Sequence, residues 1–147
     1  MRELMWKEII TEADVEALMN DYGYFHDSCL RDIYISTREY VDVRLAMHFE
    51  NKTTGILLFQ RQFDKNTVLE LKFENIDRFN FNPLGPEYYG VIYDATFKKV
   101  GSLFYWADTE DWEVEDQDAT WISSSKVYFR YRPELRGNIF RLRENDG

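Results

Sequence analysis

The sequence predicts an α+β domain in which one N-terminal helix packs on a mostly antiparallel, strongly twisted sheet of about seven strands. Two patterns support this prediction. One segment near the N-terminus has apolar residues at helical spacing, and the chain from about residue 24 onward alternates between apolar and polar residues. Alternation with a period of two indicates strands with one buried and one solvated face. The 147 residues are enough for one core, so we treat 1–147 as a single domain.

The helix is expected over about residues 11–22, and its start is well marked. Thr11 followed by Asp14 resembles a capping box in which a carboxylate replaces the usual Glu or Gln. Gly23 supplies the stop. The apolar residues that share one face of this helix, and should pack on the sheet, are Val15, Leu18, Met19 and Tyr22.

Turn residues separate the segments that are expected to form strands. The strands are predicted at 29–36, 41–50, 55–63, 68–76, 88–97, 102–107 and 120–131. Segment 41–50 has the clearest alternation, and the short loops around it predict a meander of hairpins. Two prolines and a glycine in 82–86 predict a long connection inside the domain. Residues 133–147 form a basic C-terminal tail.

Composition limits the classes of partner. The net charge of -9 disfavours nucleic acid and anionic membranes and favours a basic protein. Cys29 is the only cysteine, which excludes an intrachain disulfide and a cysteine-rich zinc site, and two histidines exclude a multi-histidine metal centre. We therefore expect no cofactor and no metal. The sequence has no secretory leader pattern and no apolar run of membrane-spanning length, so we expect a cytoplasmic protein.

The acidic run over 108–118 is the first candidate site. Its alternating carboxylates are compatible with calcium, but the run lacks the glycine and the flanking helices of an EF-hand. It is either a solvated loop or a surface that attracts a basic partner. In the second case, which is our leading hypothesis, the partner-binding residues are Asp108, Glu110, Asp111, Trp112 and Glu113.

A rival hypothesis is a small hydrolase, or a binder of carbohydrate or another small ligand. His26 lies next to Asp27, but neighbouring residues on an extended chain point to opposite sides, so we expect the two not to cooperate. In the rival site, carboxylates and a histidine converge on a pocket walled by tryptophans. Its residues would be His26, Asp94, Asp108, Glu110, Trp106 and Trp121. Convergence on one concave site favours the rival, and dispersal over a convex surface favours a binding protein.

Most aromatic residues are expected in the core, because a domain of this size needs its large apolar side chains inside. Phe104 and Trp106 share one strand face and Tyr105 lies on the other, so this strand is either central or presents an aromatic patch. Arg130 and Arg132 are expected to pair with the acidic run, and an anion site is the alternative.

Three features carry a resemblance to a known family. Phe25-His26-Asp27 follows the short helix, paired alternating strands come next, and then the alternating segment from Leu69 to Ile76. In these features the region from Phe25 to Phe81 resembles small bacterial proteins with an FHD motif, among them an immunity-protein family of polymorphic-toxin systems. The resemblance implies a non-catalytic protein that binds and blocks a cognate toxin in the producing cell. The stretch from Trp106 to Trp121 lies outside it.

Overall fold

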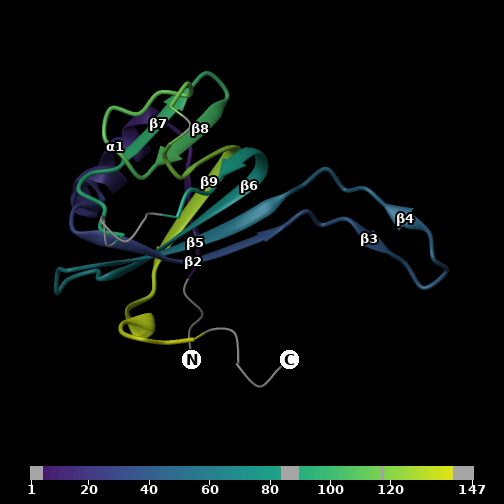
Figure 1. Ribbon diagram of the computed structural model, residues 1–147, viewed down its shortest axis with the longest axis horizontal. Helices are drawn as coiled ribbons and strands as arrows, with labels where there is room; N and C mark the ends of the chain where they lie inside the picture. The colour runs from purple at the N-terminus through teal and green to yellow at the C-terminus, as the bar shows by residue number, and fades with distance from the viewer. Residues whose placement is uncertain (1–4, 84–89, 117, 141–147) are drawn as a thin grey trace.

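The structure is a computed structural model that describes residues 5–83, 90–116 and 118–140. One helix and a mostly antiparallel sheet confirm the α+β fold class (Figure 1). The elements are β1 (Lys7–Ile9), α1 (Glu12–Asp21), the 3-10 turn η1 (Gly23–Phe25), β2 (Ser28–Ser36), β3 (Tyr40–Val41), β4 (Met47–His48), β5 (Thr54–Arg61), β6 (Val68–Asn80), β7 (Thr96–Val100), β8 (Leu103–Ala107), β9 (Trp121–Tyr131) and the 3-10 turn η2 (Pro133–Leu135).

The main sheet consists of two meanders joined side by side. Its order is β2-β5-β6-β9-β8-β7, so the halves meet where β6 pairs with β9. β1, which the sequence did not predict, pairs with β9 beyond the end of β8. A register shift between Ile76 and Arg78 bends β6, as expected where two residues oppose one.

The capping box predicted for α1 is present. Thr11 Oγ1 accepts from the N–H of Asp14 at 3.1 Å, and Asp14 Oδ2 accepts from the N–H of Thr11 at 3.0 Å. Figure 1 shows α1 beside β7, where it covers one face of the sheet. The predicted helix face is buried there together with the inward side chains of the sheet, which include Leu57, Phe59, Leu71, Phe73, Trp106 and Ile122.

The strand with aromatics on both faces is central, which confirms the burial interpretation. β8 lies between β7 and β9, and Phe104 and Trp106 are buried in the main core. Tyr105 packs on the opposite face against a second small cluster. The residues of this cluster are Ala107, Trp112, Ala119 and Trp121.

The expected pairing of Arg130 and Arg132 with the acidic run was wrong. Both donate to the fully buried Glu70 on neighbouring β6, each at 2.8 Å, because the β6–β9 register places Glu70 opposite Arg130. Arg132 also binds Glu134. Arg130 and Arg132 therefore neutralise a buried charge of their own sheet.

The prediction of one continuous strand over 41–50 was wrong. Residues 37–53, which we call the arm, form a separate hairpin in which only β3 and β4 pair. Asp42 reverses the chain, because its Oδ1 accepts from the N–H groups of Arg44 at 2.8 Å and Ala46 at 3.0 Å. The alternating apolar side chains consequently have no core to face, and Val43 is 99% exposed and Leu45 84% exposed.

The strand predicted at 88–97 was wrong in its bounds, and the predicted connection and tail lie partly outside the described residues. The strand predicted at 88–97 is instead the shorter β7, and within its described part the preceding chain makes only a bridge between Ile92 and Ser28. Residues 84–89, within the predicted connection and strand, lie outside the described residues. The basic tail is described only as far as residue 140.

Candidate functional site: an acidic cavity

A cavity of about 500 Å³ opens where β6 and β8 end and β7 and β9 begin. Residues of the β6–β7 connection, of the β8–β9 connection and of β2 line it, so residues far apart in the sequence meet there. The carboxylates at this cavity belong to Asp94, Asp108, Glu110 and Asp118. Its exposed apolar and aromatic edge includes Phe81, Val91 and Tyr93.

Asp108 is fixed at the cavity by a short polar network. Its N–H donates to the carbonyl of Thr120 at 3.0 Å, and its Oδ1 accepts from the N–H of Thr120 at 3.1 Å. The Thr120 hydroxyl bonds both backbone groups of Asn82, which joins the ends of β6, β8 and β9. Burial raises the pKa of Asp108 to about 6, although the bond from Thr120 opposes this effect. Asp108 is therefore ionised at neutral pH, and this ionisation lowers the stability of the folded state.

Backbone bonds to the FHD motif hold the Asp94 side of the cavity. The N–H of Asp27 donates to the carbonyl of Ile92 at 2.9 Å, and the N–H of Ile92 donates to the carbonyl of Ser28 at 2.7 Å. The N–H of Ala95 donates to the carbonyl of Tyr24 at 2.9 Å. Residues 90–95 thus lie along the turn that precedes β2.

His26 contacts both of its acidic neighbours. Its Nε2 lies 3.4 Å from Asp27 Oδ2, and its Nδ1 lies 3.4 Å from Asp94 Oδ1 and 2.5 Å from the carbonyl of Tyr93. The expectation that His26 and Asp27 point apart was wrong, because Asp27 has a φ of 56° and is not extended. The Tyr93 carbonyl, then Asp27 and Asp94, raise the pKa of His26.

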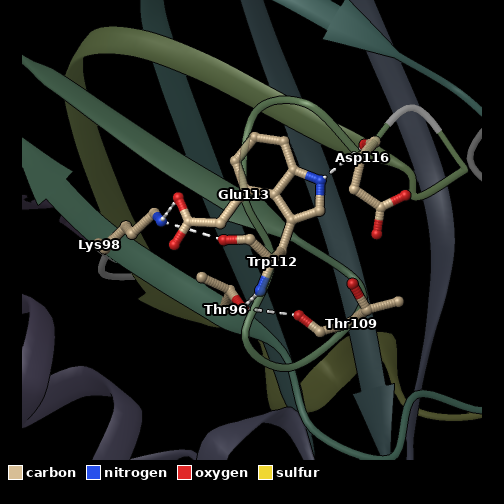
Figure 2. A network of polar contacts seen from close by, with 6 residues as sticks. All are labelled: Thr96, Lys98, Thr109, Trp112, Glu113 and Asp116. Carbon is tan, nitrogen blue, oxygen red and sulfur yellow. Dashed lines mark hydrogen bonds and ion pairs between the residues drawn. The ribbon is translucent and has the colours of Figure 1, made fainter.

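The acidic segment between β8 and β9 is anchored by Trp112, which is only 1% exposed. Its ring centroid lies 4.9 Å from that of Trp121 and 6.0 Å from that of Tyr105. Its indole Nε1 donates to the carbonyl of Asp116 at 3.0 Å (Figure 2). This tryptophan folds its own loop and is not available to a partner.

A second set of contacts ties the same loop to β7, as Figure 2 shows. The hydroxyl of Thr96 donates to the carbonyl of Thr109 at 2.7 Å and accepts from the N–H of Trp112 at 3.1 Å. Lys98 Nζ donates to the carbonyl of Trp112 at 3.0 Å and pairs with Glu113 at 3.2 Å. The acidic residues beside the cavity therefore extend from an ordered loop.

The structure divides both predicted sets of site residues. From the partner-binding set, Asp108 and Glu110 line the cavity, Asp111 is exposed outside its lining, and Glu113 pairs with Lys98. The placement of Trp112 on a binding surface was wrong, because it is buried. From the rival set, Asp94 also lines the cavity and contacts His26.

The tryptophan walls of the rival pocket were misplaced. Trp106 lies in the main core and Trp121 in the second cluster, so neither lines this cavity. Asp118 was part of the predicted acidic run but of neither set of site residues, and sequence reasoning missed Phe81, Val91 and Tyr93. For Asp118 the available signal was its position just before the strand predicted at 120–131, where loop side chains gather, whereas Val91 and Tyr93 fell inside the strand predicted at 88–97.

Among the described residues, no group of three or more His, Cys, Asp or Glu side chains has the arrangement to hold a metal ion. Within the same part of the chain, no helix has the length and apolar character needed to cross a membrane. Comparisons with protein-family models, curated proteins and solved structures give no match for this chain.

Proposed function

We propose that this protein is a non-catalytic binding domain whose acidic cavity receives a lysine or arginine side chain of a basic protein. Three carboxylates of the rival set do converge on one cavity, which is the arrangement expected of a small-ligand site, but Trp106 and Trp121 do not line it. The observation that carries the proposal is therefore the combination, at one cavity, of four carboxylates with an exposed apolar edge in place of the expected tryptophan walls. An arginine or lysine has a matching shape, because its charged head needs carboxylates while its aliphatic stem packs on apolar surface.

The charges at the cavity support a cationic occupant. Glu110 and Asp118 have no basic side chain within ion-pair distance among the described residues. Asp108 remains ionised above about pH 6 despite partial burial. A bound cation would stabilise these charges, and the overall charge of -9 would accelerate its arrival.

The partner is proposed to be a basic toxin in the cell that makes this protein. The resemblance of the Phe25-His26-Asp27 region to immunity proteins supports this partner, and the motif lies beside the cavity through the contact of His26 with Asp94. We propose a cytoplasmic location, for which the free, exposed Cys29 is suited because a reducing compartment preserves thiols. Nucleic acid and membranes are excluded from this proposal by the negative charge.

The test uses three short probes: acetyl-Gly-X-Gly-amide, with X as Arg, Lys or Gln. NMR titration of the labelled protein should show saturable shifts of the amides at 90–94, 108–110 and 118–120 with Arg or Lys, and none with Gln. The variant with Asp94→Asn, Glu110→Gln and Asp118→Asn should lose at least about tenfold in affinity, since charge-assisted hydrogen bonds each contribute ~1.5–3 kcal/mol.

A matched control carries the same change in charge elsewhere. Glu12→Gln, Glu39→Gln and Asp77→Asn alter exposed residues outside the cavity lining. This control should retain affinity for the Arg and Lys probes at moderate salt, because exposed charges beyond a Debye length of ~8 Å are screened. Equal weakening in both triple variants would show general charge attraction and refute a cavity site.

One observation favours a second candidate, carboxylate-assisted hydrolysis of a small ligand. The pKa of Asp108 is raised while Asp94 and Glu110 lie at the same cavity, and a carboxyl that holds its proton near pH 6 can serve as a general acid. The burial of Trp106 and Trp121 removes the stacking platform expected for a sugar. Turnover of aryl glycosides or esters that is abolished by Asp108→Asn would establish this candidate, and an inactive purified protein would eliminate it for those substrates.

A further inference from the structure

The arm, residues 37–53, carries the largest group of exposed apolar side chains in the described chain. It extends beyond the ends of β2 and β5, away from α1 and from β7 and β8 (Figure 1). Its exposed apolar side chains are Tyr40, Val41, Val43, Leu45, Met47 and Phe49. Val41 and Met47 lie opposite each other in the hairpin, so apolar side chains gather on one of its faces. Exposed apolar surface of this kind on a folded protein is typical of an interaction site.

The tip of the arm is built to hold its shape. Asp42 binds the N–H groups of Arg44 and Ala46 and also approaches His48 Nε2 at 2.8 Å. The rings of Tyr40 and His48 stack with centroids 4.6 Å apart. A preorganised hairpin loses little conformational entropy on docking, so its apolar side chains can contribute fully to binding.

The charge at the tip indicates what the arm contacts. Residues 37–53 carry three basic and three acidic side chains, Arg38, Arg44 and Lys52 against Glu39, Asp42 and Glu50, so the arm is neutral on a protein of charge -9. Arg44 lies between Val43 and Leu45, the two most exposed apolar residues of the arm. In the described part of the chain, no carboxylate lies within ion-pair distance of Arg44.

We propose that the arm of one copy docks in the acidic cavity of a second copy, with Arg44 as the cation that the cavity receives. Val43 and Leu45 would cover the apolar edge formed by Phe81, Val91 and Tyr93. This inference rests on the proposed function, because it assigns a particular cationic side chain to the same site. The second copy is favoured because the tip and the cavity are complementary in both charge and apolar character.

The geometry makes the contact intermolecular and reciprocal. Leu30 of β2 lines the cavity, and the tip at Leu45 is roughly 50 Å of extended chain away at ~3.4 Å per residue. The bridge between Ser28 and Ile92 places the cavity near the start of β2, whereas the arm follows the other end of β2, so the arm points away from its own cavity. Two copies placed side by side in opposite directions can bring each tip to the other's cavity, which is the two-fold closed arrangement expected of a dimer. A basic toxin would then have to displace the arm.

The experiment measures self-association by sedimentation velocity over a wide range of protein concentration. Arg44→Glu and Glu110→Lys should each weaken the dimer by about tenfold or more, because each places like charges together in the contact. The double variant, which exchanges the two charges, should recover part of the association lost in Arg44→Glu, because one opposite-charge contact is restored while Asp94, Asp108 and Asp118 remain at the cavity. Arg38→Glu is the matched control at the base of the arm and should leave the dimer unchanged. Circular dichroism melting confirms that each variant folds.

The outcomes separate this inference from the proposed function. A wild-type chain that stays monomeric at every concentration, or a dimer indifferent to Arg44→Glu, overturns arm exchange. Binding of the Arg and Lys probes to monomeric Arg44→Glu protein leaves the cavity function in place, whereas absence of probe binding refutes that function. A monomer whose arm binds phosphatidylcholine vesicles would assign the arm to membranes and also overturn the proposal.

Discussion

Replacement of Asp108 by Asn should stabilise the fold at neutral pH. Burial, reinforced by the charge of Asp116, raises the pKa of the Asp108 carboxyl from 3.8 to about 6. Since one pH unit of pKa change corresponds to ~1.4 kcal/mol, ionised Asp108 costs the folded state about 3 kcal/mol at most. Asparagine keeps the oxygen that accepts from the N–H of Thr120, so the variant removes the charge without removing this bond.

The sign of the pH dependence follows from the direction of this shift. Below about pH 4 the carboxyl is protonated in the folded and the unfolded chain, and it contributes no difference. Between about pH 4 and pH 6 the folded chain holds the proton more tightly, so the stability contributed by this group falls as the pH rises. Above pH 6 the full cost of ionisation is present. The advantage of Asp108→Asn should therefore grow from near zero at pH 4 to about 1–3 kcal/mol at pH 7.5.

Urea unfolding followed by circular dichroism at pH 4, 5, 6 and 7.5 measures this advantage. Asp111→Asn is the control, because this residue is exposed on the same loop and its replacement should change stability by no more than ~0.5 kcal/mol. A variant that is less stable than wild type at pH 7.5, or an advantage independent of pH, would refute the assignment of a costly buried charge. The same variant should bind cationic probes more weakly, which would show that stability is lost to keep the site charged.

Three other predictions concern the framework around the cavity. Glu70→Gln should destabilise the fold by about 3–5 kcal/mol, because it leaves two partly buried guanidinium groups without their shared anion. The control, Glu134→Gln, changes an exposed residue and should cost less than ~1 kcal/mol. Equal losses of stability in urea unfolding would contradict this prediction. Trp112→Ala should cost about 3–5 kcal/mol and release the acidic loop, seen as faster amide exchange over 108–116, and unchanged exchange would show that other contacts hold the loop. His26 should titrate by NMR above its usual pKa of 6.5, and Asp94→Asn should lower that midpoint; a midpoint unaffected by this variant would contradict the contact.

The regular elements of the fold could be predicted because local signals agreed with burial. The Thr11–Asp14 capping box and the helical spacing after it defined α1, and alternation between turn residues defined β2, β5, β6, β8 and β9. The prediction of a strand over 41–50 failed because alternation indicates only that the two faces of a segment differ in polarity. It does not indicate whether another element covers the apolar face. The warning sign was Asp42 in mid-segment, since an aspartate can bond the N–H groups two and four residues ahead and reverse the chain.

Part of the cavity was also within reach of the sequence. A hairpin centred near Gly101 pairs Thr96 with Ala107, and this register brings Asp94 and Asp108 to the same end of β7 and β8. Asp118 and Phe81 depend on the pairing of β6 with β9 across a long connection, which no local pattern fixes. The role of Trp112 was equally non-local, because its burial depends on Trp121 from another element.

The two features that conflict with a maximally stable monomer carry the functional argument. The buried charge of Glu70, in contrast, is paired internally with Arg130 and Arg132. The half-buried charge of Asp108 and the exposed apolar arm have no such internal answer: the first is destabilising as long as the cavity holds no cation, and the second leaves apolar surface in water. A cationic side chain flanked by apolar residues would stabilise the ionised Asp108 and would bury apolar surface in the same contact. Arg44 of a second copy has that composition, and a basic toxin would have to reproduce it in order to compete.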